Sequence, residues 1–211
     1  MPSGVVSKTS LQMSYQIITK AQQQRSEWAG GSTLQLQIHP ADATLAERNF
    51  AWRLSSATVN QGGAFSQFAG FGRWLGIRQG AGLTLQIDDH RLALSQRSHL
   101  IWFSGDAKTS AELIDGPVVD INLILAPGWQ GGMQALEFSA DQQQLMLTSE
   151  AEEFLLYVDF GMLLLNIDER QLRLEAGEVL RCKVTELDST KLFARASSSN
   201  ASAVLAWVSQ Y

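Results

Sequence analysis

The chain has 211 residues, 45% of them hydrophobic, and its 16 Lys and Arg against 21 Asp and Glu give a formal net charge of −5. This apolar content excludes a disordered chain and supports a core of ordinary size. The negative charge argues against a nucleic-acid-binding protein, and no apolar stretch reaches the roughly 18–20 residues of a membrane helix.

The predicted elements are almost all short strands, because apolar and polar residues alternate between turn-forming residues. Helix is scarce: residues 41–48 and 109–113 each predict a turn or two, and residues 22–26 predict a solvated loop. Gly131-Gly132 is one of the predicted separators. In chain order, the strand-like segments are residues 33–39, 50–59, 73–78, 83–87, 100–103, 118–125, 144–148, 154–158, 162–167, 180–184 and 204–208.

The chain also contains an internal repeat. Segment 75–94 aligns without gaps on segment 155–174, at an offset of 80 residues. Five leucines of the first segment meet leucines of the second, and the Ile-Asp pair at 87–88 meets the pair at 167–168. The shared unit is strand, tight turn, strand, acidic turn and short strand. A duplication of this unit predicts two related barrels or sandwiches.

Residue types that typically build metal or catalytic sites are few. His39, His90 and His99 form no His-x-His pair, and Cys182 has no ligand partner nearby, so we expect no transition-metal site. We interpret His39 and His90 as surface residues. The sequence has no nucleophile elbow and no phosphate-binding loop. It therefore indicates no cofactor, although a carboxylate-rich site for a hard cation stays open.

Six tryptophans are present in the chain. Trp52, Trp74 and Trp102 fall within strand patterns and are predicted to lie in the core. Trp28 precedes a pair of glycines in a loop-like setting, where a ligand-stacking role and a core role are equally consistent with the pattern.

Arg53 is a charged residue within the predicted strand at residues 50–59. Its neighbours on the same strand face are Ala51, Ser55 and Ala57, and these small side chains leave space around the guanidinium. A buried arginine needs an anion or a carboxylate partner, and its planar fork suits a carboxylate ligand. The alternative is an edge strand with Arg53 in solvent.

Asp120 and Asn122 lie in the middle of the predicted strand at residues 118–125, on one face and opposite an apolar face. Both are poor strand formers, and buried polar groups must be hydrogen-bonded, either to a neighbouring loop or to a ligand. Because Arg53 and Ser55 also share a strand face, we expect these four side chains to converge on one cavity.

In order and spacing, these segments resemble the HutD/Ves family of bacterial bicupins. The chain departs from the family pattern at three places. The turn after Trp28 is shortened. Ala64 and Ala69 replace two loop prolines, and Ala126-Pro127 replaces basic residues. The matching motifs are Trp28 before a glycine-rich turn, Trp52-Arg53-Leu54-Ser55, the loop from Gly63 to Gly70 with Ser66 and the following Arg73, Gly105-Asp106, and Asp120-Ile121-Asn122.

The resemblance implies an all-β bicupin, with two stacked cupin-like barrels related by the 80-residue repeat. The expected domains are residues 1–127 and 128–211, with the option that terminal strands cross between the barrels. It also implies a pocket in the N-terminal barrel. The candidate ligand-binding residues are Arg53, Ser55, Ser66, Asp120, Asn122, Trp28 and Arg73.

We therefore predict a non-enzymatic, metal-free protein that binds a small polar or carboxylate-bearing metabolite, with a sensor or flux-limiting role linked to histidine utilisation or stress response. In this hypothesis Arg53 binds a carboxylate, and Asp120 positions Arg53 or meets a ligand amine or imidazole. One alternative is a metal-independent enzyme with Asp120 as general base, which an adjacent arginine disfavours by lowering the pKa of that carboxyl. Another is a protein-interaction scaffold with a vestigial pocket.

The sequence also predicts the cellular location and the partners of the protein. The segment MPSGVVSKTSLQ lacks the apolar core of a secretion signal, and the single Cys182 forms no internal disulfide, so we expect a cytoplasmic protein. We expect neither nucleic acid nor a membrane as partner, and a homodimer stays open.

Overall fold

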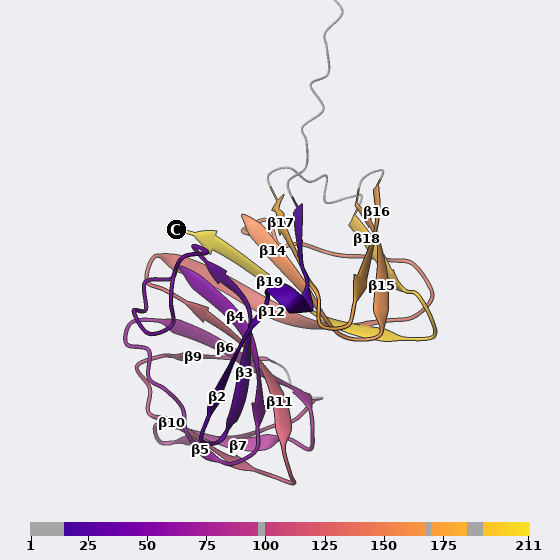
Figure 1. Cartoon of the computed structure of the whole chain (residues 1–211). Coiled ribbons are helices and arrows are strands. Elements are labelled where there is room, and N and C mark those ends of the chain that lie inside the picture. Colours follow the sequence, from indigo (N-terminus) through magenta and orange to yellow (C-terminus); the bar gives the residue numbers. More distant parts are fainter. Residues whose placement is uncertain (1–14, 97–99, 168–169, 185–191) are drawn as a thin grey trace, which may run out of the picture.

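The computed structural model describes residues 15–96, 100–167, 170–184 and 192–211 (Figure 1). The N-terminal segment considered above, His99, and Asp168 of the second Ile-Asp pair lie outside these ranges. Within the described ranges, no helix has the length and apolar character needed to cross a membrane. A short 3-10 turn, η1 (Lys20–Gln22), precedes the first long hairpin.

The N-terminal barrel is built from two antiparallel sheets that share one apolar core, with Val59 and Leu75 from one sheet packed against Leu83 and Leu85 from the other. Its six-stranded sheet has the order β2 (Gln24–Trp28), β3 (Gly31–His39), β4 (Trp52–Val59), β11 (Val118–Leu125), β6 (Gly72–Gln79) and β9 (Ile101–Ser104). Its four-stranded sheet has the order β5 (Gly63–Ala64), β10 (Thr109–Leu113), β7 (Leu83–Ile87) and β8 (His90–Leu94).

The C-terminal barrel has the same two-sheet plan and a core of its own. Its five-stranded sheet has the order β1 (Tyr15–Ile18), β17 (Val179–Lys183), β14 (Glu153–Phe160), β19 (Ala201–Gln210) and β12 (Trp129–Phe138). Its four-stranded sheet has the order β13 (Gln143–Gln144), β18 (Leu192–Ala196), β15 (Met162–Ile167) and β16 (Arg170–Glu175). The first described strand, β1, therefore belongs to the sheet of the C-terminal barrel.

The strand pairing confirms the internal repeat. In the β7–β8 hairpin Leu83 lies opposite Leu94, and in the β15–β16 hairpin Leu163 lies opposite Leu174. Both members of the second pair follow the first at the 80-residue offset, so the two hairpins have the same register. Each hairpin also occupies the same place, at one end of a four-stranded sheet. The expected all-β architecture of two related barrels is confirmed.

The two barrels pack through the outer faces of their larger sheets (Figure 1). Trp52 and Leu123 of the N-terminal sheet share a buried cluster with Leu155 and Val204 of the C-terminal sheet. Because side chains alternate along a strand, the residues between the apolar ones on β4 and β11 must point into the N-terminal barrel. This packing places the polar faces of both strands inside that barrel.

Several local predictions were wrong. Residues 109–113 form strand β10 rather than a helical turn, since alternate side chains of the segment are buried. Residues 22–26 were expected in a loop, but most of them belong to β2, an exposed edge strand. The strand expected at 144–148 is limited to β13, and residues 41–48 form turns without a helix.

Two further expectations failed for reasons of packing. Gly131 and Gly132 lie inside β12 rather than in a turn, where a Cβ on Gly132 would come within 2.5 Å of the Trp207 indole nitrogen. Trp102 is 57% exposed rather than buried, because β9 is the edge of its sheet and this side chain points away from the core.

Candidate ligand-binding site

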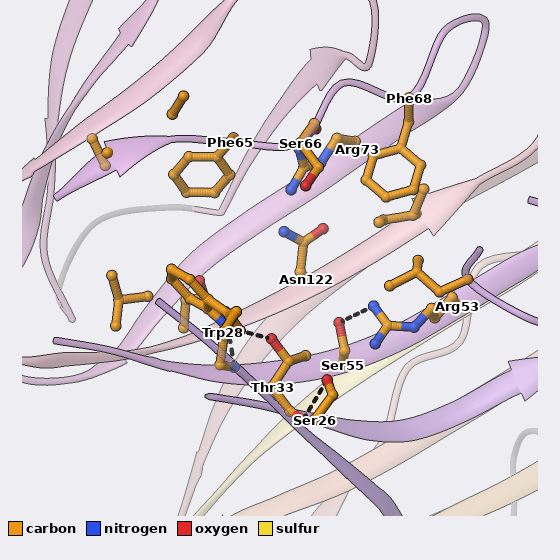
Figure 2. A pocket seen from close by; sticks show the side chains of 18 of the residues that line it. Ser26, Trp28, Thr33, Arg53, Ser55, Phe65, Ser66, Phe68, Arg73 and Asn122 are labelled. Carbon is orange, nitrogen blue, oxygen red and sulfur yellow. Dashed lines mark hydrogen bonds between the residues drawn. The ribbon is translucent and has the colours of Figure 1, made fainter. Parts of the chain in front are cut away.

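A cavity of about 330 Å³ lies inside the N-terminal barrel (Figure 2). Its walls come from both sheets of the barrel and from the loop that follows β5. The structure brings all seven predicted site residues to this one cavity, whose lining includes Trp28, Arg53, Ser55, Ser66, Arg73, Asp120 and Asn122.

Strand register explains how the polar side chains meet. Arg53 of β4 and Arg73 of β6 both lie opposite Ile124 of the central strand β11, one on each side. Neighbouring strands are about 4.8 Å apart, so the two arginine Cα atoms are separated by roughly 10 Å. Two residues along β11, Asn122 lies opposite Ser55. The two guanidinium groups therefore approach the same region of the cavity from either side.

Arg53 is buried and held by neutral groups. Its Nε donates a hydrogen bond to Gln35 Oε1 at 2.9 Å, and its Nη1 donates to Ser55 Oγ at 3.0 Å. Burial lowers the pKa of the guanidinium to about 10, which leaves it charged at neutral pH. The edge-strand alternative is wrong, since β4 lies between β3 and β11. Gln35 was not among the predicted site residues, although its alternating strand lies beside β4.

Arg73 is buried among aromatic rings. Its guanidinium carbon lies 5.2 Å from the ring centroid of Phe65, 5.5 Å from Phe68 and 5.1 Å from Phe103. Its Nη1 donates a hydrogen bond to the backbone oxygen of Ser66 at 3.0 Å, so the carbonyl and not the hydroxyl of that serine is used. Burial lowers the pKa of Arg73 to about 10. These contacts fix the side chain, and its Nε has no hydrogen-bond partner among the residues that the structure describes.

Asp120 is only 3% exposed, and burial raises the pKa of its carboxyl to about 7. The hydrogen bond that its Oδ1 accepts from the Ala57 N–H, at 3.1 Å, and the attraction of Arg73 and Arg53 oppose this rise. Both arginines lower this pKa, as expected, but the net shift is upward because burial is the larger effect. No ion pair joins Asp120 to either arginine among the described residues, so desolvation outweighs attraction. Gln35 and Ser55, rather than Asp120, position Arg53.

Asn122 projects from β11 towards the middle of the cavity (Figure 2). Its Oδ1 is buried and has no hydrogen-bond partner in the described part of the chain. A buried polar atom without a partner costs about 1–3 kcal/mol. Asn122 and Arg73 both line the cavity, and each keeps one buried polar atom without a partner among the described residues.

Trp28 forms the opposite wall and ends the edge strand β2. Its indole nitrogen donates a hydrogen bond to Thr33 Oγ1 at 3.2 Å, and the side chain is 45% exposed. A Cβ on Gly30 would lie 2.3 Å from the indole ring, so a larger residue at this position would displace the ring. The shortened turn therefore still carries Trp28 to the cavity.

The donor set in this cavity does not fit the metal ion that cupin barrels often hold. Its lining has no histidine or cysteine, and its carboxylates, Glu27 and Asp120, share the space with two buried arginines. Across the described ranges, no three His, Cys, Asp or Glu residues gather as a metal-binding group. The metal-free expectation remains a prediction for elemental analysis.

His39 was expected at the surface but is partly buried where the two barrels meet. Its ring stacks on Trp52 at a centroid distance of 5.5 Å, and its Nδ1 lies 3.3 Å from Arg181 Nη2. His90 is exposed in β8. Neither histidine contributes to the cavity.

Comparison with known proteins gives a family match over most of the chain. The HutD family model matches residues 20–201. The protein described as "Uncharacterized 21.2 kDa protein in hutC 3'region" of Pseudomonas putida is 32% identical over 136 residues, which cover 61% of this chain and 71% of that protein.

Two solved structures have the same fold. The conserved protein of unknown function PA5104 from Pseudomonas aeruginosa PAO1 has a TM-score of 0.78 and 24% identity, covering 94% of this chain and 100% of that one. HutD from Pseudomonas fluorescens SBW25, described in a formate condition, has a TM-score of 0.70, also at 24% identity and with the same coverage. These matches confirm the bicupin fold.

Proposed function

The chain belongs to the HutD family, and we propose that its N-terminal barrel binds a small molecule carrying a carboxylate. The observation that carries the proposal is the state of Arg53. Its guanidinium is buried, is oriented by Gln35 and Ser55, and has no ion-pair partner in the described part of the chain. A buried cation that lacks a counter-ion is costly, and a carboxylate ligand would supply one.

The charge balance of the cavity supports an anion. Arg53 and Arg73 are both cationic at neutral pH, whereas the pKa of Asp120 is about 7 and its carboxyl is only partly ionised there. Glu27, the other carboxylate of the lining, is exposed and forms an ion pair with Arg25, so the two buried arginines leave the cavity net positive. Ser55 and Asn122 add hydrogen-bonding groups that can orient the bound molecule.

The biological role that fits such a site is sensing or limiting a metabolite in the bacterial cytoplasm. The family name points to histidine utilisation. A protein that binds an acidic metabolite without converting it can report on its concentration or restrict its supply.

The experiment is a calorimetric titration with sodium acetate as the carboxylate probe and neutral acetamide as its matched control. We expect acetate to bind and acetamide not to bind. Arg53→Gln should weaken acetate binding at least tenfold, because it keeps a polar side chain but removes the charge. Arg91→Gln, at an exposed arginine outside the cavity, should leave binding unchanged. Acetate binding that is insensitive to Arg53→Gln would contradict the proposal.

A second candidate function is metal-independent acid–base catalysis, and one observation favours it. The pKa of Asp120, about 7, is close to the value that suits a group both giving and taking a proton at neutral pH. Intermediates of the histidine pathway, incubated with the protein and followed by NMR, test this function. Turnover that Asp120→Asn abolishes while binding persists would favour the enzyme over the binding protein.

A further inference from the structure

We infer that the ligand of this cavity is a planar acid, whose flat apolar body lies between the rings of Trp28 and Phe65 while its carboxylate meets Arg53. The inference rests on the proposed function and narrows it from carboxylates in general to aromatic or conjugated acids. It follows from how the cavity divides into a polar region and an apolar region.

The two regions lie at different places along the same strand. Arg53 and Ser55 occupy the polar region on β4, with Asn122 beside them on β11. Further along β4 the inward residues are Ala57 and Val59, which are apolar, and Asp120 lies opposite Ala57 on β11 as the polar group of this apolar end. A ligand that fills the cavity and places its charge at Arg53 therefore has its remaining body at this end, beside Ala57, Val59 and Asp120.

Trp28 is a fixed aromatic wall at the apolar end. The hydrogen bond from its indole nitrogen to Thr33 and the close approach of Gly30 hold the ring against its own hairpin. With 45% of the residue exposed, the ring also presents surface that no described side chain covers. A large aromatic side chain held in one orientation is suited to stacking on a flat ligand.

Phe65 supplies a ring on the other side. It follows β5 of the four-stranded sheet, whereas Trp28 belongs to the six-stranded sheet, so the two rings lie on opposite walls (Figure 2). The Phe65 N–H donates to the Thr109 oxygen at 2.8 Å, and Arg73 contacts its ring. Both anchors fix Phe65 in place, so the space between the two walls is preformed.

The spacing sets the size of the ligand. Thr33, which holds the Trp28 indole, lies opposite Ala57, and Ala57 is four residues from Arg53 on β4. These four residues of β4 span roughly 13 Å. The extended Arg53 side chain can cover part of this distance, and the ligand would span the rest. A cavity of about 330 Å³ is at the small end for ligand sites. One ring bearing a carboxylate, directly or through a short link, matches these dimensions.

The test compares three probes: benzoate, cyclohexanecarboxylate and acetate. Benzoate and cyclohexanecarboxylate have the same number of carbons and the same charge, and they differ in planarity. We expect benzoate to bind at least fivefold more tightly than either of the others. Trp28→Leu should remove most of this preference and leave acetate affinity within twofold, while Trp28→Phe retains part of the preference because a ring remains.

Trp102→Leu is the matched control, since this exposed tryptophan lies outside the cavity. Circular dichroism of each variant checks that it is folded, which is expected for a partly exposed residue on an edge strand. Three acids that bind with equal affinity, or a benzoate preference that survives Trp28→Leu in a folded protein, would overturn the inference and leave the proposed function standing. Failure of all three acids to bind would instead overturn the proposed function.

Discussion

Replacement of Asp120 by asparagine should stabilise the protein at alkaline pH. The folded-state pKa of this carboxyl, about 7, lies above its ordinary value of 3.8 because the group is buried. Between these two values the unfolded chain loses the proton while the folded chain keeps it, so the free energy of unfolding falls as pH rises. Above pH 7 the folded protein carries the full cost of a buried carboxylate. Asparagine resembles the protonated acid in shape and never carries that cost.

The magnitude follows from the difference between the two pKa values. One pKa unit corresponds to about 1.36 kcal/mol, so the full cost above pH 7 is on the order of 4 kcal/mol, of which about 1.5 kcal/mol is already present at pH 5. The stability advantage of Asp120→Asn should therefore grow by about 2.5 kcal/mol between pH 5 and pH 8. For a chain of this length, such a change corresponds to a difference of roughly 5–10 °C in Tm.

Urea unfolding of the two proteins at pH 5, 6, 7 and 8 measures this difference directly. Asp89→Asn, in an exposed turn, is the matched control and should follow the wild-type curve at every pH. The asparagine side chain can still accept the Ala57 N–H through its Oδ1, so the backbone contact is preserved. A constant difference between Asp120→Asn and wild type across this pH range would refute the reasoning, because it would mean that Asp120 does not titrate there.

Three further predictions concern charge and metal. Acetate affinity should fall as pH rises through about 7, because ionisation of Asp120 adds a negative charge near the two arginines; titrations at pH 6 and 8.5 check this, and equal affinities would count against it. Protein purified without chelator should contain no stoichiometric transition metal by elemental analysis, and one equivalent of zinc, iron, nickel or manganese would disprove this. Arg78→Ala should lower the free energy of unfolding by about 3–5 kcal/mol in denaturant titrations, because it leaves Asp159, 2.6 Å away across the two barrels, buried without its cation. A loss below 1 kcal/mol would show that this pair is not needed.

The direction in which side chains point on a strand, and the internal repeat, are properties that the sequence determines by itself. Alternation along β4 and β11 puts Arg53 with Ser55, and Asp120 with Asn122, on shared faces whatever surrounds them. The 80-residue repeat likewise follows from residue identities alone, and it predicted two equivalent hairpins. Such inferences succeed because the direction of a side chain on a strand depends only on its position along that strand.

Neighbours in space and depth of burial were decided only by the tertiary structure. Gln35 became the partner of Arg53 because β3 lies beside β4, and Trp102 became exposed because β9 lies at an edge. Asp120 was expected to have a lowered pKa beside an arginine, yet its pKa is raised, since full burial without an ion pair outweighs the attraction of both arginines. Strand order, distances between side chains and exclusion of water arise when segments far apart in the chain pack together, and no local pattern records them.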